Sequence, residues 1–322
     1  MPKPKLTDAQ FIALWHEHCS VVRVAKASGQ TERNIASRRR SIESRHKIIL
    51  PTIDPRHPSY NSIKPNESST GAVARYRIDD GTIIVGSDAH IWPGPLTTMQ
   101  RAFLRFAERL KPAAVVANGD FFDGAKQSRW PTIGWETKPT VRQELEAVAD
   151  YMAELKKAGG RAKRFWPLGN HDARFETRIA NSMPELEGVA GVHLKDHIPG
   201  WIPCWRVDVN DDIVIRHREV GGEHADWNNV VKGGKTIITG HDHRTGVVPF
   251  HNYRGLHFGV RCGFLADSPL DPQFVNYMEA REPNWHPAFI VLTFRGGRLL
   301  WPELVTRHDE GKVEFRGEVI NV

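Results

Sequence analysis

The stretch WPLGNHDARF, residues 166–175, joins an apolar run to three consecutive polar side chains. The apolar residues are typical of a buried strand, and Gly169 lets the chain turn tightly where that strand ends. Asn170, His171 and Asp172 follow at once. Asn and Asp favour ordinary polar turns, but side chains at the end of a strand can also do chemistry. This stretch alone leaves both interpretations open.

Four other apolar runs of the chain end in the same way, in side chains that can bind a metal. They are IIVGSDAH with Asp88 and His90, VVANGDFFD with Asp120 and Asp123, IVIRH with His217, and TIITGHDH with His241 and His243. Ligands of open α/β sheets bind at the carboxyl ends of the strands. Because all five ends carry only Asp, Asn and His, we expect them to converge on one metal site.

The residue types of these blocks indicate which metals would bind. No cysteine takes part, which argues against a structural zinc site. Carboxylate, imidazole and amide oxygen suit two divalent metal ions, Mn²⁺ above all, with Fe or Zn²⁺ as alternatives. Two cations about 3.5–4 Å apart, joined by a bridging carboxylate, clamp an oxygen between them. A bridging hydroxide formed there near neutral pH can attack phosphorus, so the blocks predict a phosphoester hydrolase.

In their order along the chain, the blocks resemble the signature of the calcineurin-like metallophosphoesterases, over about residues 80–265. Four of the five blocks match fully, as DAH, GDFFD, GNHD and GHDH. The resemblance implies an α/β fold, a four-layer αββα sandwich with a dinuclear metal centre at the strand ends. It also implies the ligands of each metal, which are Asp88, His90 and His243 for one, Asn170, His217 and His241 for the other, and Asp120 as the bridge.

The resemblance implies roles for three further residues. His171 would act as a general acid or bind the phosphate, Asp172 would orient an imidazole, and Asp123 would lie behind the ligands. The fourth block departs from the family, in which a glycine usually follows the histidine, because the chain here reads RHREVGGEHADW. We take His217 as the ligand, and His224 is the alternative.

Composition and charge limit the classes of protein to which the chain can belong. Hydrophobic residues make up 40% and charged residues 25% of the 322 residues, as in soluble globular proteins. No apolar run approaches the roughly 20 residues of a membrane span, and the start lacks the apolar core of a signal peptide. Three widely spaced cysteines suit reduced thiols. We therefore expect a cytoplasmic protein that does not bind a membrane.

The net charge of +6 lies entirely in the first 50 residues, which hold ten Lys or Arg and four acids. The remaining residues carry 34 bases and 34 acids. We expect a helical module at residues 1–48, a Pro- and Ser-rich linker at 49–72, and a metallophosphoesterase domain at 73–322. A basic module on a neutral body suggests two parts with different partners.

Residues 6–47 read as three helices, with Thr7 or Asp8, Ser20 and Thr31 as their caps. The pattern resembles a small all-α, helix-turn-helix-like domain whose third helix would recognise DNA. The candidate nucleic-acid contacts on that helix are Arg33, Arg38, Arg39 and Arg40. A helical bundle whose arginines only face the solvent is the alternative.

From residue 73 the pattern alternates between strands and helices, which predicts an α/β core. Residues 73–78 and 82–90 read as a hairpin, and the chain after residue 247 is richer in strands than in helices. The insertion at residues 124–139 follows the second metal block and brings Lys126, Arg129 and Trp130 to the rim of the site. Cations beside indoles suit a single nucleic-acid strand, although a loop packed on its own domain would look the same.

These observations lead to one main hypothesis and two alternatives. The main hypothesis is a dinuclear-metal-dependent phosphoester hydrolase acting on DNA, as a nuclease or an end-processing enzyme. The second is a phosphatase of phosphoproteins or small phosphoesters. The third is a DNA-binding regulator with a non-catalytic metallophosphoesterase body, against which the complete ligand set argues.

Overall fold

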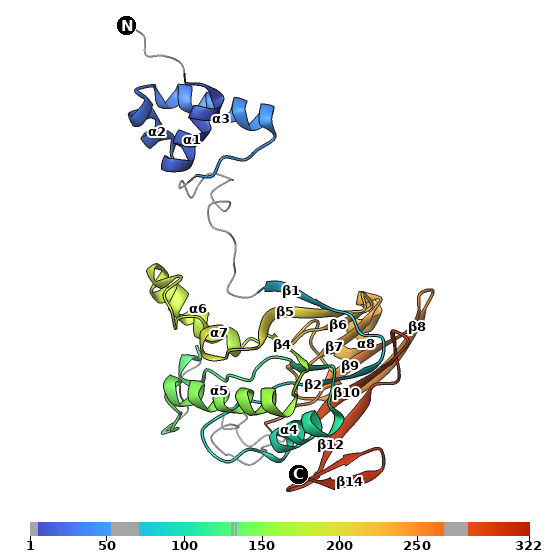
Figure 1. Cartoon of the computed structure of the whole chain (residues 1–322). Helices are drawn as coiled ribbons and strands as arrows, with labels where there is room; N and C mark the ends of the chain where they lie inside the picture. Colours follow the sequence, from blue (N-terminus) through green and yellow to red (C-terminus); the bar gives the residue numbers. More distant parts are fainter. Residues whose placement is uncertain (1–5, 53–70, 130–131, 133, 267–282) are drawn as a thin grey trace. The chain divides into compact units, whose positions relative to one another are not determined.

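The computed structural model describes residues 6–52, 71–129, 132, 134–266 and 283–322. The chain divides into two compact units, Met1–Ser68 and Ser69–Val322, and Figure 1 shows the elements of each. Trp130 and residues 53–70 of the predicted linker lie outside the described residues. In the described ranges, no helix has the length and apolar character that crossing a membrane requires.

The described residues of the first unit form three helices, α1 (Asp8–His18), α2 (Val21–Ser28) and α3 (Glu32–His46). Thr7 caps α1 through reciprocal hydrogen bonds with Gln10, and the Thr31 hydroxyl accepts the Asn34 N–H at the start of α3. The helices predicted for residues 6–47 are therefore confirmed. They enclose a small core formed by Phe11, Trp15, Val24, Ala25, Ile35, Ile42 and Leu50.

One predicted nucleic-acid contact, Arg39, lies inside this unit and is only 2% exposed. Its Nε donates to Glu43 Oε1 at 2.9 Å, and its guanidinium lies 4.7 Å from the ring of Trp15. A further hydrogen bond runs from its Nη2 to the carbonyl oxygen of Leu50. Arg39 thus stabilises the helical unit, and the prediction that it contacts nucleic acid is wrong. Arg38 is half-buried and pairs with Asp8.

The second unit contains one large mixed sheet, in the order β14-β13-β12-β10-β2-β3-β4-β5-β6-β7-β9-β8. Its strands are β1 (Gly71–Tyr76), β2 (Gly81–Gly86), β3 (Ala114–Ala117), β4 (Lys163–Pro167), β5 (Ile202–Val209), β6 (Ile213–Ile215), β7 (Thr236–Thr239), β8 (Thr245–Asn252), β9 (Gly255–Cys262), β10 (Ala288–Arg295), β11 (Arg298–Leu299), β12 (Glu303–Asp309), β13 (Lys312–Phe315) and β14 (Glu318–Asn321). Strands β2 to β5 run parallel, as do β6, β7 and β9. The predicted excess of strands after residue 247 is confirmed.

The α-helices in the described part of this unit are α4 (Thr98–Leu110), α5 (Val141–Ala158), α6 (Asp172–Ser182), α7 (Leu194–His197) and α8 (Ala225–Gly233). Threonines cap α4 and α5 through capping boxes, Thr97 with Gln100 and Thr140 with Gln143. The helix α8 packs against β7, β8 and β9, and Figure 1 shows α4 and α5 side by side near β2 and β10.

Two hydrophobic cores show the layering, because neighbouring residues of a strand face opposite sides of the sheet. Ile84 of β2 packs in the core that contains the apolar faces of α4 and α5. Ile83 and Val85 pack in a second core, together with Val207 of β5 and Val260 of β9. Two halves of the sheet thus face each other, with helices outside both. The predicted α/β sandwich of four layers agrees with this arrangement.

The predicted hairpin between residues 73–78 and 82–90 is not formed. Strand β1 pairs in parallel with β5, whereas β2 lies between β10 and β3. The side chain of Asn210, in the turn after β5, accepts the Ile78 N–H at 2.9 Å and donates to the Ile78 carbonyl at 2.6 Å. These two hydrogen bonds hold the segment after β1 against the turn after β5. The two edges of β2 pair with β10 and β3, and neither is left for β1.

Candidate metal centre

The sequence-predicted ligands lie in five loops, each at the carboxyl end of a strand of the larger unit. Asp88 and His90 follow β2, Asp120 follows β3, Asn170 follows β4, His217 follows β6, and His241 and His243 follow β7. The parallel strands β2, β3 and β4 end at the same edge of the sheet, and the sequence-distant loops after β6 and β7 meet them there.

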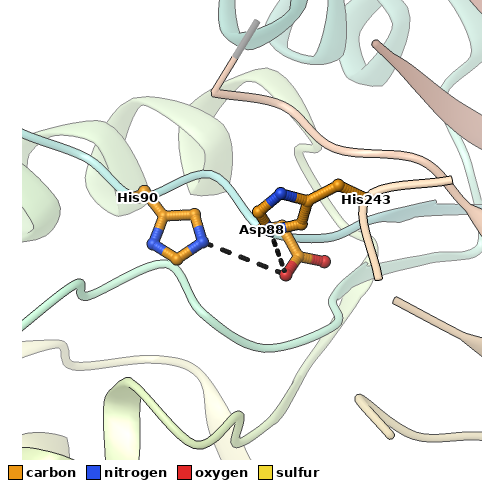
Figure 2. Close-up of side chains that lie close together, drawn as sticks. All are labelled: Asp88, His90 and His243. Carbon is orange, nitrogen blue, oxygen red and sulfur yellow. Dashed lines mark ion pairs between the residues drawn. The ribbon is translucent and has the colours of Figure 1, made fainter. Parts of the chain in front are cut away.

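One cluster consists of Asp88, His90 and His243, whose ligand atoms lie within 4.8 Å of one another. His243 Nε2 is 3.2 Å and His90 Nε2 is 3.9 Å from Asp88 Oδ1. Figure 2 shows both imidazoles directed at this carboxylate. All three side chains are buried, so the Asp88 carboxylate is shielded from water and contacts the two imidazoles instead.

A second cluster consists of Asp120, His217 and His241, again with ligand atoms within 4.8 Å of one another. His217 Nε2 lies 3.0 Å from Asp120 Oδ2, and its Nδ1 lies 2.9 Å from the carbonyl oxygen of Asn118. A carbonyl only accepts, so Nδ1 carries the proton and Nε2 is left for a metal. His224 is exposed at the start of α8 and belongs to no metal-capable group of the described residues.

The two clusters are joined through Asp88. Its Oδ2 accepts the backbone N–H of His241 at 2.8 Å and the Ser87 hydroxyl at 2.5 Å, which leaves Oδ1 to face the imidazoles of its own cluster. Burial raises the pKa of Asp88, but the imidazoles of His217 and His243 outweigh burial and lower it below its ordinary value. The carboxylate is therefore ionised at neutral pH.

The pKa of His217 shifts in the direction opposite to that of Asp88, because the same contacts stabilise both charges. Burial lowers its pKa, but the carboxylates of Asp120 and Asp88 outweigh burial and raise the pKa to about 10. These buried acids favour a positive charge among them, and without a metal a proton on His217 supplies it. A divalent cation would supply more charge at the same place and would displace that proton.

The backbone of the ligand loops is unusual, because five of the predicted ligands have a positive φ. They are Asp88 (54°), His90 (40°), Asp120 (54°), His241 (75°) and His243 (59°). Such conformations are uncommon outside glycine and persist only where surrounding contacts determine them. Asp, Asn and His tolerate them best, so the residue types of the site and the shape of its loops agree.

Two glycines of the motifs make room for ligands on neighbouring loops. A Cβ at Gly169 would lie 2.0 Å from Asp120 Oδ1, and a Cβ at Gly119 would lie 2.4 Å from Nδ1 of His217. Gly119 also has φ +85°. Neither contact is sterically allowed, so glycine is required at both positions for the loops to approach each other.

His171, the predicted general acid, lies beside the clusters. Its Nδ1 is 2.6 Å from Asp123 Oδ1, and its Nε2 is 4.0 Å from Asp120 Oδ2. Asp123 also contacts His90 Nδ1 at 3.1 Å and accepts the Trp92 indole N–H at 3.0 Å. Asp123 thus holds the far side of two imidazoles, the position expected of a carboxylate behind the ligands.

Asp172 has a different place from the one expected. Its Oδ2 accepts the backbone N–H groups of Asp120 and Gly169 at 2.8 and 2.9 Å, and its Oδ1 accepts that of Phe122 at 2.9 Å. Both oxygens are thus used by the backbone, and the side chain is 1% exposed. Instead of orienting an imidazole, Asp172 ties the loop after β3 to the loop after β4.

The sequence gives no role to two ionisable residues beside the site. Arg174 lies in the first turn of α6, with its Nη2 3.0 Å from His171 Nε2. Glu144 of α5 is fully buried, and its two oxygens accept the N–H groups of Gly124 and Ala125 at 2.5 and 3.3 Å. The spacing of three between His171 and Arg174 is a usable signal, because α6 begins there. Glu144 gives none.

Two of the nucleic-acid contacts predicted in the insertion at residues 124–139, Lys126 and Arg129, lie within the described residues. Lys126 lies in the 3₁₀ turn Ala125–Gln127, directly after the Asp123 loop, and is exposed. Arg129 is exposed a few residues further on. These cations stand on the loop that carries Asp123, while Arg33 and Arg40 are exposed on α3 of the other unit.

The donor atoms fit divalent cations. Among the described residues, no hydrogen-bond partner satisfies the buried Asn170 Oδ1, and the buried atoms Asp88 Oδ1 and His217 Nε2 face only other predicted ligands, His243 at 3.2 Å and Asp120 at 3.0 Å. Buried polar atoms are rarely left in this state. Each belongs to a predicted ligand, and each is an oxygen or nitrogen of the kind that Mn²⁺, Fe or Zn²⁺ accepts. A cation would satisfy all three.

Strand-end carboxylates and imidazoles in a layered α/β sandwich define a metal-dependent phosphoesterase, and comparison with known proteins agrees. The model of the calcineurin-like phosphoesterase family matches residues 81–245, just over half of the chain. The chain therefore belongs to the calcineurin-like phosphoesterases, which are metal-dependent hydrolases of phosphoester bonds.

Two bacteriophage proteins are similar to the chain over most of its length. The Gene 54 protein of Mycobacterium phage D29 is 26% identical over 246 residues, which cover 69% of this chain and 92% of that protein. The Gene 54 protein of Mycobacterium phage L5 is 26% identical over 242 residues, with the same coverage.

Proposed function

We propose that this phosphoesterase holds two divalent cations, of which Mn²⁺ suits the ligands best, and that it hydrolyses DNA as a nuclease or an end-processing enzyme. The observation that carries the choice of DNA is the location of the charge. The whole net charge of +6 belongs to the first 50 residues, while the catalytic body is neutral. A phosphate backbone is the partner that a small basic unit attracts most strongly.

The residues of the site divide the work of hydrolysis. Bound divalent cations would supply a nucleophile at neutral pH and neutralise the oxygens of the phosphoryl group. Asp120 belongs to the cluster of His217, and its carbonyl oxygen accepts the N–H of His90 in the other cluster at 2.9 Å. Its carboxylate would bridge the two cations, with Asp88 among the ligands of one and His217 among the ligands of the other. Their ionised carboxylates and unprotonated Nε2 atoms are the forms that bind cations.

His171 is the residue that would handle the proton of the leaving group. Asp123 accepts from its Nδ1 at 2.6 Å, which fixes the ring and leaves Nε2 to face the substrate. Arg174, 3.0 Å from that nitrogen, adds positive charge where a phosphate oxygen would lie. In this arrangement Nε2 accepts from Arg174. For general acid catalysis Arg174 would turn to a phosphate oxygen, and Nε2, then protonated, would give its proton to the departing oxygen of the ester.

The exposed side of α3 supports DNA as the partner. The exposed positions that recur every three or four residues along one side of this helix are Arg33, Ser37, Arg40 and Ser44, and Lys47 follows at its end. No acid lies among them. Arginine and hydroxyl side chains are common donors to phosphates and base edges. The exposed Lys126 and Arg129 give the catalytic body its own cations near the Asp123 loop.

Two assays test the proposal. The protein is incubated with Mn²⁺ and single-stranded DNA, duplex DNA, p-nitrophenyl phosphate or bis-p-nitrophenyl phosphate. Cleavage of DNA and of the diester is expected. Hydrolysis of the monoester alone would contradict the choice of DNA and favour a phosphatase, and absence of turnover with Mn²⁺, Fe²⁺ or Zn²⁺ would favour a regulator.

The second assay concerns the helical unit. The double variant Arg33→Gln/Arg40→Gln should weaken DNA binding and reduce the slope of log K against log salt by about two, because each phosphate contact contributes about one. Turnover of bis-p-nitrophenyl phosphate should not change. Arg105→Gln/Lys157→Gln removes the same charge from exposed positions of α4 and α5 and serves as the control. Equal slopes in both variants would remove α3 from the DNA-binding account.

A further inference from the structure

An ionic network lies directly behind the loop that carries two predicted ligands, His241 and His243, and of its three members Arg261 and Asp226 are buried and Asp242 is half-buried. Asp242, between them, accepts the Arg244 N–H on Oδ1 at 3.2 Å and the Arg261 Nη1–H on Oδ2 at 3.3 Å. Arg261 belongs to β9, where it stands opposite Thr239 at the end of β7. The side chain between the two histidines is thus held from the neighbouring strand.

Arg261 is in turn held by Asp226 of α8. Its Nε and Nη2 donate to Asp226 Oδ2 at 3.1 and 2.9 Å, and its Nη1 also donates to the Glu223 carbonyl at 3.3 Å. All three guanidinium nitrogens are therefore used. Arg261 is 9% exposed and Asp226 is 5% exposed, so these bonds are shielded from water.

The close packing of α8 against two strands fixes the position of Asp226. A Cβ at Gly259 of β9 would lie 2.0 Å from the Asp226 carbonyl oxygen. A Cβ at Gly246 of β8 would lie 2.5 Å from Asp226 Oδ2. The start of α8 therefore rests against bare backbone of two strands, and the Asp226 carboxylate is fixed relative to the sheet.

We propose that Asp226, Arg261 and Asp242 form an ionic clamp that positions the loop of His241 and His243, and that this clamp sets the affinity of the site for divalent cations. The three residues act on the cation through the two histidines and are positioning residues. The inference rests on the metal assignment made in the proposed function.

Two physical arguments support the clamp. His241 and His243 both have a positive φ, and such a loop keeps its shape only where its surroundings determine it. A buried guanidinium between two carboxylates adds little net stability, because desolvation offsets much of the attraction, but its directed bonds fix geometry. The clamp also holds two acids for one base, so one negative charge remains near the ligands.

The test measures cation binding by the full-length protein without any substrate. Asp242→Ala should weaken Mn²⁺ binding, measured by calorimetry, by about 10–100-fold, the usual effect of losing a group that orients a ligand. It should also change the visible absorption of bound Co²⁺, which reports the coordination geometry. Asp242→Asn keeps an oxygen for Arg261 and should restore much of the affinity.

Asp80→Ala is the matched control, because Asp80 is an exposed carboxylate that pairs with Arg295 at 3.8 Å and accepts the Gly296 N–H at 3.3 Å, away from the predicted ligands. It should bind Mn²⁺ like the wild type. An Asp242→Ala protein with wild-type affinity and an unchanged Co²⁺ spectrum would overturn the clamp. So would a loss of affinity that Asp242→Asn does not reduce and that accompanies a lower melting temperature of the metal-free protein. A wild-type protein that binds neither metal would refute the metal assignment itself.

Discussion

The guanidinium of Arg174 lies against the outer nitrogen of His171, with 3.0 Å between Nη2 and Nε2, while its Nη1 donates to the Asp123 carbonyl at 2.9 Å. Arg174→Ala should lower kcat for bis-p-nitrophenyl phosphate by about 10–100-fold, because a hydrogen bond to a charged group contributes about 1.5–3 kcal/mol. Mn²⁺ affinity should hardly change, since Arg174 is no ligand.

The control for this prediction is Arg178→Ala, which removes an exposed arginine one turn further along α6. Its kcat should equal that of the wild type. Equal losses in the two variants would mean that the positive charge of α6 matters in general and that the contact with His171 does not.

Asp120 and His171 should separate metal binding from turnover. Asp120→Ala removes the carboxylate that lies 3.0 Å from His217 Nε2, and the protein should lose metal when its content is measured after gel filtration. His171→Ala should keep its metal and lose turnover by about 100–10,000-fold, the range for general acid catalysis. A metal-free His171→Ala protein would show that His171 is a ligand.

Asp172 should matter chiefly for stability. Because its carboxylate accepts three backbone N–H groups inside the protein, Asp172→Ala should lower the free energy of unfolding by about 3–5 kcal/mol, measured with urea on the metal-free protein. Asp196→Ala, which removes an exposed acid that accepts one N–H from Gly191, should lower it far less. Similar losses would contradict the role given to Asp172.

Glu144 should make stability depend on pH. Burial, assisted by the charge of Asp123, raises the pKa of Glu144 to about 8. The unfolded chain then releases this proton near its ordinary pKa of about 4.3, before the folded protein does. The contribution of Glu144 to the free energy of unfolding therefore falls as the pH rises from about 4 to about 8, and is constant above that.

The variant Glu144→Gln cannot release a proton and should lack this decline. Its free energy of unfolding, relative to that of the wild type, should increase between pH 5 and pH 8, measured with urea in the presence of a chelator. Glu146→Gln, on the exposed side of the same helix, should show no such increase. Parallel pH curves for Glu144→Gln and the wild type would refute the raised pKa.

Much of the larger unit could be predicted from the sequence, because its signals are local. Apolar runs that end in Asp, Asn or His gave the strands and the edge at which they meet. The pairing of β1 could not be predicted, since its partner β5 lies more than 120 residues away and no local pattern distinguishes it from β2. Capping threonines such as Thr31 gave the starts of helices reliably.

The errors at individual residues have a common cause. Arg39, Asp172 and Glu144 are polar side chains whose surroundings are formed by other parts of the chain. The sequence shows that a charge is present but not whether tertiary packing buries it. The sequence pattern therefore predicts a surface contact at Arg39, the family resemblance implies an imidazole partner for Asp172, and neither gives a signal at Glu144.

The left-handed backbone of the ligand loops bears on how this centre can change over time. At His241 and His243 the conformation suits His, Asp and Asn alike, whereas bulky aliphatic side chains would strain it. An exchange within that small group replaces nitrogen by oxygen and moves the preference toward harder cations, without moving the main chain. The backbone of these loops can therefore stay the same while single exchanges among His, Asp and Asn change which metal the site prefers.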